Sequence, residues 1–241
     1  MSPNDPTAQF YDLKDEVALE ITDAEVALIN TIVESPAKIL DIGCGTGRHL
    51  IPLNKSRHHL FGLDNSREHL KILRAKYPQA KFQQTNFWDF QTKEKFDLII
   101  LMWNAFNEIV LEDQELIEFF KKCQQFLQPR GKILINFMNF PKLDLSHWHA
   151  ESGRELDGIK YKFSWQVQDF DPETNTTISK ETISWLEVEI STEIKQRWWQ
   201  LAEIERVATD FGFNSEAKSL SVNDDIYLIL QGRIAIRQCY R

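Results

Sequence analysis

The fold class is indicated by residues 39–48, which read ILDIGCGTGR. A short apolar strand runs into three alternate glycines, and a helical stretch begins directly after them. Glycine permits a tight turn and lets the backbone approach a ligand where a Cβ would collide. A strand, glycine turn and helix in this order are typical of an open α/β sheet, whose ligands bind at the carboxyl ends of the strands.

The segments around this turn alternate between short apolar runs and amphipathic stretches. The apolar runs predict strands at residues 38–42, 59–63, 80–84, 96–101, 132–137 and 227–236, and helical spacing predicts helices at 17–33, 48–55, 67–77, 112–127 and 200–211. This alternation predicts βα units stacked on a parallel sheet. Residues 159–167, 177–185 and 187–194 show period-2 alternation instead, which predicts an antiparallel ribbon. We therefore expect a single domain, residues 1–241, with a β insertion at about residues 141–197.

Composition limits the classes of partner. The 241 residues hold 28 Lys and Arg against 36 Asp and Glu, a formal charge of −8, and the pI is about 5.3. This balance argues against nucleic acid and anionic membranes, because both are bound through clustered Lys and Arg. The cysteines Cys44, Cys123 and Cys239 are widely spaced, Met1–Asp5 lacks a signal-peptide pattern, and the apolar run Leu98–Trp103 is too short to span a bilayer. A soluble cytoplasmic protein is expected.

The acidic residues near the glycine turn indicate what it binds. Asp64 follows Gly43 by 21 residues and ends the second predicted strand, where a carboxylate can accept hydrogen bonds from both hydroxyls of a ribose. A dinucleotide-binding turn needs glycine where this chain has Arg48, and no P-loop pattern is present. Asp41 would repel a pyrophosphate but suits a cationic or amine-bearing ligand. For the glycines alone, a purely structural turn is the alternative.

Five segments in order resemble the motifs of class I S-adenosylmethionine-dependent methyltransferases, in particular the small-molecule branch. They are LDIGCGTG at 40–47, FGLDNS at 61–66, NFW at 86–88, FDLII at 96–100 and FLQPRGK at 126–132. The resemblance implies a Rossmann-like α/β fold with a seven-stranded, mostly parallel sheet, helices on both faces and a small antiparallel β insertion. It also implies S-adenosylmethionine as cofactor and in-line methyl transfer to a small-molecule nitrogen or oxygen nucleophile, with S-adenosylhomocysteine as product.

The same resemblance assigns cofactor-binding roles. Asp64 would hold the adenosyl ribose, Asn86 and Phe87 would lie beside the adenine, and Tyr11 would cover the cofactor. The full predicted set is Tyr11, Asp41, Gly43, Cys44, Gly45, Gly47, Asp64, Asn65, Asn86, Phe87, Met102 and Trp103. Two of these have structural alternatives, because Cys44 can serve as a small packing residue and Trp103 as core filling at a strand end.

Catalysis and acceptor binding are predicted from position. The sulfonium donor is already activated, so alignment and exclusion of water are the main requirements, and no metal site is predicted. His147 and His149 lie after the fifth strand and are candidate general bases, with exposed loop histidines as the alternative. Asn104, Trp165 and Arg197 are candidate acceptor-binding residues, although the aromatic residues of the ribbon can equally pack it against the sheet.

The acceptor itself is predicted only as a class. Residues 103–106 read WNAF, not the N-P-P-[YFW] motif of methyltransferases that modify nucleic-acid amino groups, so a small molecule is favoured. Two other functions stay open: a catalytically silent S-adenosylmethionine-binding protein, and a nucleotide-dependent oxidoreductase. A monomer or a homodimer is expected.

Overall fold

The computed structural model describes residues 6–138, 145–156, 158–223 and 225–232 of the chain. The predictions on Met1–Asp5 and Cys239 lie outside these residues, as do residues 141–144 of the predicted insertion and 233–236 of the last predicted strand. Among the described residues, no helix is both long and apolar enough to cross a lipid bilayer.

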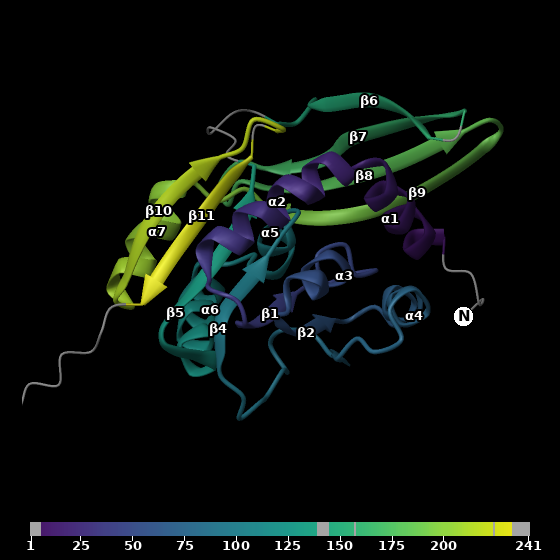
Figure 1. Cartoon of the computed structure of the whole chain (residues 1–241). Coiled ribbons are helices and arrows are strands. Elements are labelled where there is room, and N and C mark those ends of the chain that lie inside the picture. The colour runs from purple at the N-terminus through teal and green to yellow at the C-terminus, as the bar shows by residue number, and fades with distance from the viewer. Residues whose placement is uncertain (1–5, 139–144, 157, 224, 233–241) are drawn as a thin grey trace, which may run out of the picture.

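The larger sheet has seven strands in the order β10-β11-β5-β4-β1-β2-β3 (Figure 1). Their bounds are β1 Lys38–Ile42, β2 His59–Asp64, β3 Phe82–Gln84, β4 Phe96–Leu101, β5 Leu127–Phe137, β10 Phe213–Ser219 and β11 Ile226–Gly232. Strands β1 to β5 run parallel, whereas β11 is antiparallel to both of its neighbours. Because β1 lies between β2 and β4, the chain leaves it toward one side and later returns on the other, which opens a crevice at the carboxyl ends.

Helices cover both faces of this sheet because both faces of its strands are apolar. In β1, Ile39 packs in the same cluster as α2, while Leu40 packs with α6 on the other face. The helices are α1 Pro6–Val17, α2 Leu19–Ile32, α3 Leu50–Leu53, α4 Arg67–Lys76, α5 Ala105–Ile109, α6 Asp113–Phe126 and α7 Leu201–Asp210, with a 3₁₀ turn at Asn54–Ser56. Alternation along buried strands thus fixes a three-layer α/β arrangement.

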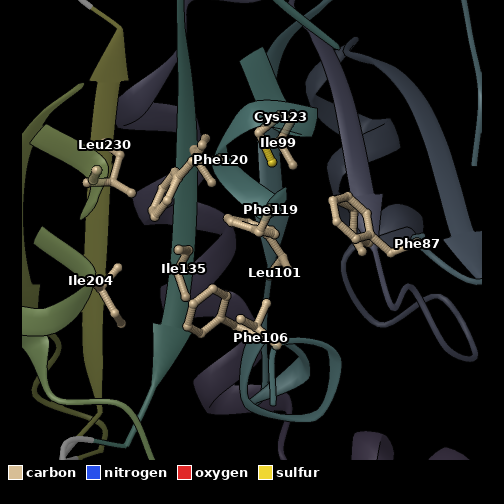
Figure 2. Packing of buried hydrophobic residues seen from close by; sticks show 14 of the residues in the cluster. Phe87, Ile99, Leu101, Phe106, Phe119, Phe120, Cys123, Ile135, Ile204 and Leu230 are labelled. Atoms are coloured by element: carbon tan, nitrogen blue, oxygen red, sulfur yellow. The ribbon is translucent and has the colours of Figure 1, made fainter. Parts of the chain in front are cut away.

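Aromatic rings of α6 anchor the loops that border the crevice (Figure 2). Phe119 is fully buried, and its ring centroid lies 5.3 Å from that of Phe106 in α5 and 5.4 Å from that of Phe87 in the loop after β3. Edge-to-face and tilted pairs at this spacing add about 0.5–1.5 kcal/mol each to simple burial. The core therefore holds the loops after β3 and β4 in place.

A second, four-stranded antiparallel sheet has the order β6-β7-β8-β9. Its strands are β6 His149–Leu156, β7 Ile159–Asp171, β8 Thr176–Trp185 and β9 Val188–Arg197, and Figure 1 shows it extending across the carboxyl end of the larger sheet. Helix α1 packs on it through Phe10, which is buried with Tyr161 and Ile183. The predicted fold class, with an antiparallel insertion, is confirmed.

Four elements were not predicted as such from the sequence: α1, α5, β6 and β10. The helix expected at residues 48–55 is also shorter, because α3 covers only Leu50–Leu53. Pro52 lacks an N–H to continue the helical hydrogen bonds. Short segments of this kind take their structure from tertiary contacts rather than from their own pattern.

Replacing the buried ring of Phe120 tests the α6 core. Phe120 is fully buried against Phe119, Phe211 and Phe213, so we expect Phe120→Ala to lower the free energy of unfolding by about 3–5 kcal/mol. Ile117→Ala is the matched control, because Ile117 lies on the same helix but is 39% exposed, and it should cost about 1 kcal/mol or less. Urea unfolding of the two variants measures the difference, and equal losses would contradict this packing.

Candidate functional site

One cavity of about 760 Å³ lies at the carboxyl ends of β1, β2 and β4. Residues of the glycine turn, of the loop after β3 and of α5 form its floor and sides, and residues of α1, β8 and β9 also line it. The crevice expected from the order of the strands is therefore enclosed by the second sheet and the N-terminal helix.

Glycine is required at the three positions of the turn for different physical reasons. Gly43 and Gly47 adopt left-handed backbone angles, with φ of +74° and +96°. A Cβ on Gly43 would lie 3.0 Å from the Cβ of Ala105, and one on Gly47 would lie 2.4 Å from Leu73 Cδ1. At Gly45, with φ +52°, a Cβ would have no described atom within 4 Å, and Gly45 lines the cavity. Gly43 and Gly47 thus serve packing, and Gly45 keeps space open.

Asp64 is held in a fixed orientation at the end of β2. One of its carboxylate oxygens accepts a 2.8 Å hydrogen bond from the Gly45 amide, and the other accepts a 2.8 Å bond from the Ser66 amide. The residue is only 8% exposed, yet it lines the cavity. Two backbone donors therefore tie this carboxylate to the glycine turn.

Asp41 is a buried carboxylate with an unused oxygen. It is 2% exposed, and its Oδ2 atom has no hydrogen-bond partner within the described part of the chain. Burial, and to a smaller degree the negative charge of Asp64, raise the pKa of Asp41 to about 6, although the charges of His49 and Arg48 oppose this. A buried acceptor of this kind is costly unless a ligand donates to it.

Glu25 of α2 is the centre of a buried hydrogen-bond network. Its Oε2 accepts from Arg48 Nη2 at 2.7 Å and lies 3.0 Å from His49 Nε2, while its Oε1 accepts from the Tyr227 hydroxyl at 3.0 Å. Burial favours the neutral acid, but the His49 and Arg48 interactions outweigh it and lower the pKa of Glu25. The Arg48 guanidinium also lies 3.5 Å from the ring centroid of Trp103, and its buried Nη1 has no described partner.

The end of β4 adopts a strained backbone. Trp103 and Asn104 both have left-handed φ angles, +53° and +60°, which cost non-glycine residues roughly 1–2 kcal/mol each. Asn136 Oδ1 accepts a 2.8 Å bond from the Trp103 amide, and Asn104 Oδ1 accepts a 3.1 Å bond from the Met138 amide. These hydrogen bonds stabilise the strained backbone at the end of β4. Such strain is common where a protein positions groups for function.

Four polar residues from four elements meet on the cavity wall: Lys14 of α1, Glu108 of α5, Glu181 of β8 and Gln196 of β9. Lys14 Nζ lies 3.1 Å from Glu181 and 5.1 Å from the Trp103 ring centroid, and the Gln196 amide donates to Glu108 at 3.4 Å. Glu108 is exposed to the open space of the cavity, which it lines. Desolvation, followed by the charge of Glu181, raises the pKa of Glu108 to about 7.

Comparison with known sequences places this site in a family. A model of a methyltransferase domain matches residues 39–131, which contain the glycine turn, Asp64 and the end of β4. The dTDP-3-amino-3,4,6-trideoxy-alpha-D-glucopyranose N,N-dimethyltransferase of Streptomyces venezuelae is 26% identical over 131 residues, or 54% of this chain and 55% of that protein. The matched part thus spans about half the length of this curated relative.

Solved structures share the whole fold. DesVI of Streptomyces venezuelae aligns with a TM-score of 0.81 and 21% identity over 94% of this chain and 98% of that one. CalS10, an amino pentose methyltransferase from Micromonospora echinaspora solved with S-adenosylmethionine bound, aligns with a TM-score of 0.73 and 17% identity over 89% and 91%. Residues 39–131 are thus similar to a methyltransferase domain, and the chain shares its fold with solved methyltransferases of the S-adenosylmethionine-dependent class. Both the predicted family and its cofactor are confirmed.

The structure brings most of the predicted cofactor-binding residues of this methyltransferase to one cavity. The predicted residues that line it are Tyr11, Gly43, Cys44, Gly45, Asp64, Asn65, Asn86, Phe87, Met102, Trp103 and Asn104. Asp41 and Gly47 are not among the described lining residues; Asp41 is buried in β1, and Gly47 packs against α4. Their roles in binding stay predictions.

The residues predicted for catalysis and acceptor binding are placed elsewhere, apart from Asn104. His147 and His149 are exposed and are not among the described lining residues. Trp165 packs between Trp148 and Trp198, with ring centroids 4.3 Å and 5.9 Å away. Arg197 donates to Asp113 at 2.5 Å and lies 3.7 Å above the Trp199 ring. The geometry does not bring these four residues to the cavity.

The group formed by Lys14, Glu108, Glu181 and Gln196 was missed from the sequence. Its members are up to 182 positions apart along the chain (Lys14 to Gln196) and share no motif. Only the fold brings them together, through α1 and α5, which were not predicted, and through strands β8 and β9 of the ribbon. No local signal in the sequence marks them.

Replacing Asp41 tests the cost of its buried charge. The folded protein holds a proton on Asp41 up to a pKa of about 6 against 3.8 in the unfolded chain, so this group lowers stability as pH rises through that window. We expect Asp41→Asn to match the wild type near pH 4 and to exceed it by on the order of 2–3 kcal/mol at pH 8. Urea unfolding of the ligand-free protein at both pH values measures this.

Asp210→Asn is the control for that experiment. Asp210 is exposed at the end of α7, so its replacement should leave the pH dependence of stability as in the wild type. A difference between Asp41→Asn and wild type that does not grow with pH would show that Asp41 is not held as a costly buried carboxylate.

Proposed function

We propose that this protein transfers a methyl group from S-adenosylmethionine to a small-molecule acceptor in the cavity described above. The observation that carries the proposal is a pair of buried, unpartnered polar atoms of opposite charge beside the glycine turn, Asp41 Oδ2 and Arg48 Nη1. The amino-acid end of S-adenosylmethionine carries an ammonium and a carboxylate, which are complementary to these two atoms. A dinucleotide pyrophosphate carries only negative charge, so the Asp41 carboxylate would repel it.

Arg48 lines the cavity, whereas Asp41 is buried in β1 and is not among the described lining residues. The rest of the cofactor is assigned to residues that line the cavity. Asp64, fixed by two backbone amides, would accept from the ribose hydroxyls, and Asn86 and Phe87 would lie beside the adenine. Gly45 leaves the open space that a ligand needs against the turn. Tyr11 of α1 would cover the cofactor, since it lines the cavity together with residues of the turn.

When bound, S-adenosylmethionine supplies a sulfonium-activated methyl group, which the lone pair of an acceptor displaces so that S-adenosylhomocysteine leaves. The protein's own contribution is to orient the acceptor and to keep water out. Strands β8 and β9, together with α1, form the outer wall of the cavity, so we propose that the second sheet is the substrate cover. Residues 141–197 then act as an insertion within a single domain.

Two similar proteins support nitrogen as the acceptor atom. The matched Streptomyces protein is named as an N,N-dimethyltransferase of an amino sugar, and CalS10 as an amino pentose methyltransferase. The formal charge of −8 separately argues against nucleic acid as the acceptor. A cytoplasmic location and a monomeric or homodimeric state stay predictions from the sequence.

Two alanine variants test the cofactor cradle. Gly45→Ala and Gly212→Ala each place a Cβ on a left-handed residue, with φ of +52° and +79°, and neither Cβ has a described atom within 4 Å. Both should therefore lose about 1–2 kcal/mol of stability. Only Gly45 lines the cavity, so we expect S-adenosylhomocysteine affinity, measured by calorimetry, to fall at least tenfold in Gly45→Ala and to stay unchanged in Gly212→Ala.

Turnover tests the activity itself. Incubating the protein with methyl-labelled S-adenosylmethionine and a panel of phosphate-free amines, amino sugars and phenols should label a nitrogen-bearing acceptor. Tight S-adenosylhomocysteine binding without labelling of any pool would favour a catalytically silent binding protein. Binding of a nicotinamide dinucleotide in place of S-adenosylhomocysteine would favour the oxidoreductase.

A further inference from the structure

The charges that line the cavity are unequal. Among the described lining residues, the carboxylates are Asp15, Asp64, Glu108, Glu115, Glu181, Glu193 and Asp225, against Lys14 and Arg48 as the only lysine and arginine. Arg48 is paired with Glu25, and its one free donor is assigned above to the cofactor. Lys14 is paired with Glu181. No lysine or arginine of the described lining is therefore left to hold a phosphate group.

The wall around Glu181 already holds an ammonium group, that of Lys14. Its Nζ lies 3.1 Å from the Glu181 carboxylate and 5.1 Å, 5.6 Å and 5.8 Å from the ring centroids of Trp103, Phe10 and Tyr11. Carboxylates and aromatic faces are the groups that recognise ammonium ions in proteins. The chemistry of this wall is thus built for a nitrogen cation.

Among the described residues of this wall, Glu108 is the carboxylate without an ion-pair partner, whereas Glu181 is paired with Lys14. Its described partner is the neutral amide of Gln196, at 3.4 Å. The charged and titratable groups that face it are Glu181, Lys14, Asp64 and Tyr11, from β8, α1 and β2, and the single positive charge of Lys14 is shared with Glu181. One further ammonium would balance the charge of the pair.

We propose that Glu108 receives the reacting nitrogen of the acceptor, and that the acceptor is a basic amine without a phosphate group. This rests on the proposed methyl transfer and specifies its substrate class. An amine that enters as an ammonium ion donates its proton to Glu108: an N–H bond breaks, an O–H bond forms, and the electron pair stays on nitrogen as the nucleophile. The proton leaves Glu108 for water once the product has left.

A basic amine without a phosphate group differs from the dTDP-linked amino sugar in the name of the Streptomyces relative. A nucleoside diphosphate sugar carries two negative charges on its phosphates, and proteins hold these with arginine, lysine or helix N-termini. In the described cavity the phosphates would meet Glu108, Glu181 and Glu193 instead. A shared fold therefore does not imply that this chain and its relative share a substrate class.

Calorimetry on protein saturated with S-adenosylhomocysteine tests the proposal, with spermidine as the phosphate-free amine and thymidine diphosphate as the competing chemistry. We expect spermidine to bind and thymidine diphosphate to bind at least tenfold more weakly. Since spermidine is charged throughout, its affinity should rise from pH 6 to pH 8 as Glu108, with a pKa of about 7, loses its proton. Glu108→Gln should weaken spermidine at pH 8 at least tenfold and remove the rise.

Glu187→Gln is the matched control, because Glu187 is exposed at the β8–β9 turn and does not line the cavity. It should bind spermidine as the wild type does, and all three proteins should bind S-adenosylhomocysteine equally. Tighter binding of thymidine diphosphate than of spermidine by the wild type would overturn the proposal, and so would an unchanged pH profile in Glu108→Gln. Failure of the wild type to bind S-adenosylhomocysteine would instead remove the proposed function itself.

Discussion

The cavity depends on the buried hydrogen bonds and ion pair that the Glu25 carboxylate makes. This carboxylate is fully buried, and burying a lone charge costs several kcal/mol, so its three partners are required rather than optional. Through Arg48 and His49 it fixes the segment after the glycine turn against α2, and through Tyr227 it fixes β11. Arg48 in turn stacks on Trp103 at the end of β4. One buried anion thus joins α2, the segment after the glycine turn, β11 and, through Arg48, the end of β4.

Around this network, several residues are kept in states that lower stability. Asp41 has a buried oxygen without a described partner, Trp103 and Asn104 have left-handed backbones, and Glu108 has a pKa raised to about 7. Each is tolerated because the aromatic core of α6 and the Glu25 network hold the surrounding loops. Costs of this kind gather where a ligand is to supply the missing partner. Trp103, Asn104 and Glu108 all line the one cavity, and this concentration supports ligand binding independently of any sequence resemblance.

The features that could be predicted from the sequence are those set by residues close together along the chain. The glycine turn, Asp64 and the apolar strands are read from short windows, since a turn and a buried strand each impose their own pattern. The individual roles of Gly43 and Gly47 were not readable, because they depend on Ala105 and Leu73, which the fold brings near. His147, His149, Trp165 and Arg197 were chosen by position along the chain, yet position does not say which way a side chain points. Arg197, for instance, is held by Asp113 and Trp199.

Substrate choice is carried by side chains that the fold family leaves free to vary. The glycine turn and Asp64 lie within residues 39–131, which match a methyltransferase domain, and their proposed role is to bind the cofactor. The opposite wall, from α5, β8 and β9 with Lys14 of α1, is the part proposed to meet the acceptor, and there the chain places Glu108 and Glu181 against a single lysine. A negative wall raises the local concentration of cations and repels phosphates over the whole cavity, because low-dielectric walls focus the field. A basic amine is then selected by the field of the cavity before any contact with its carbon skeleton is made.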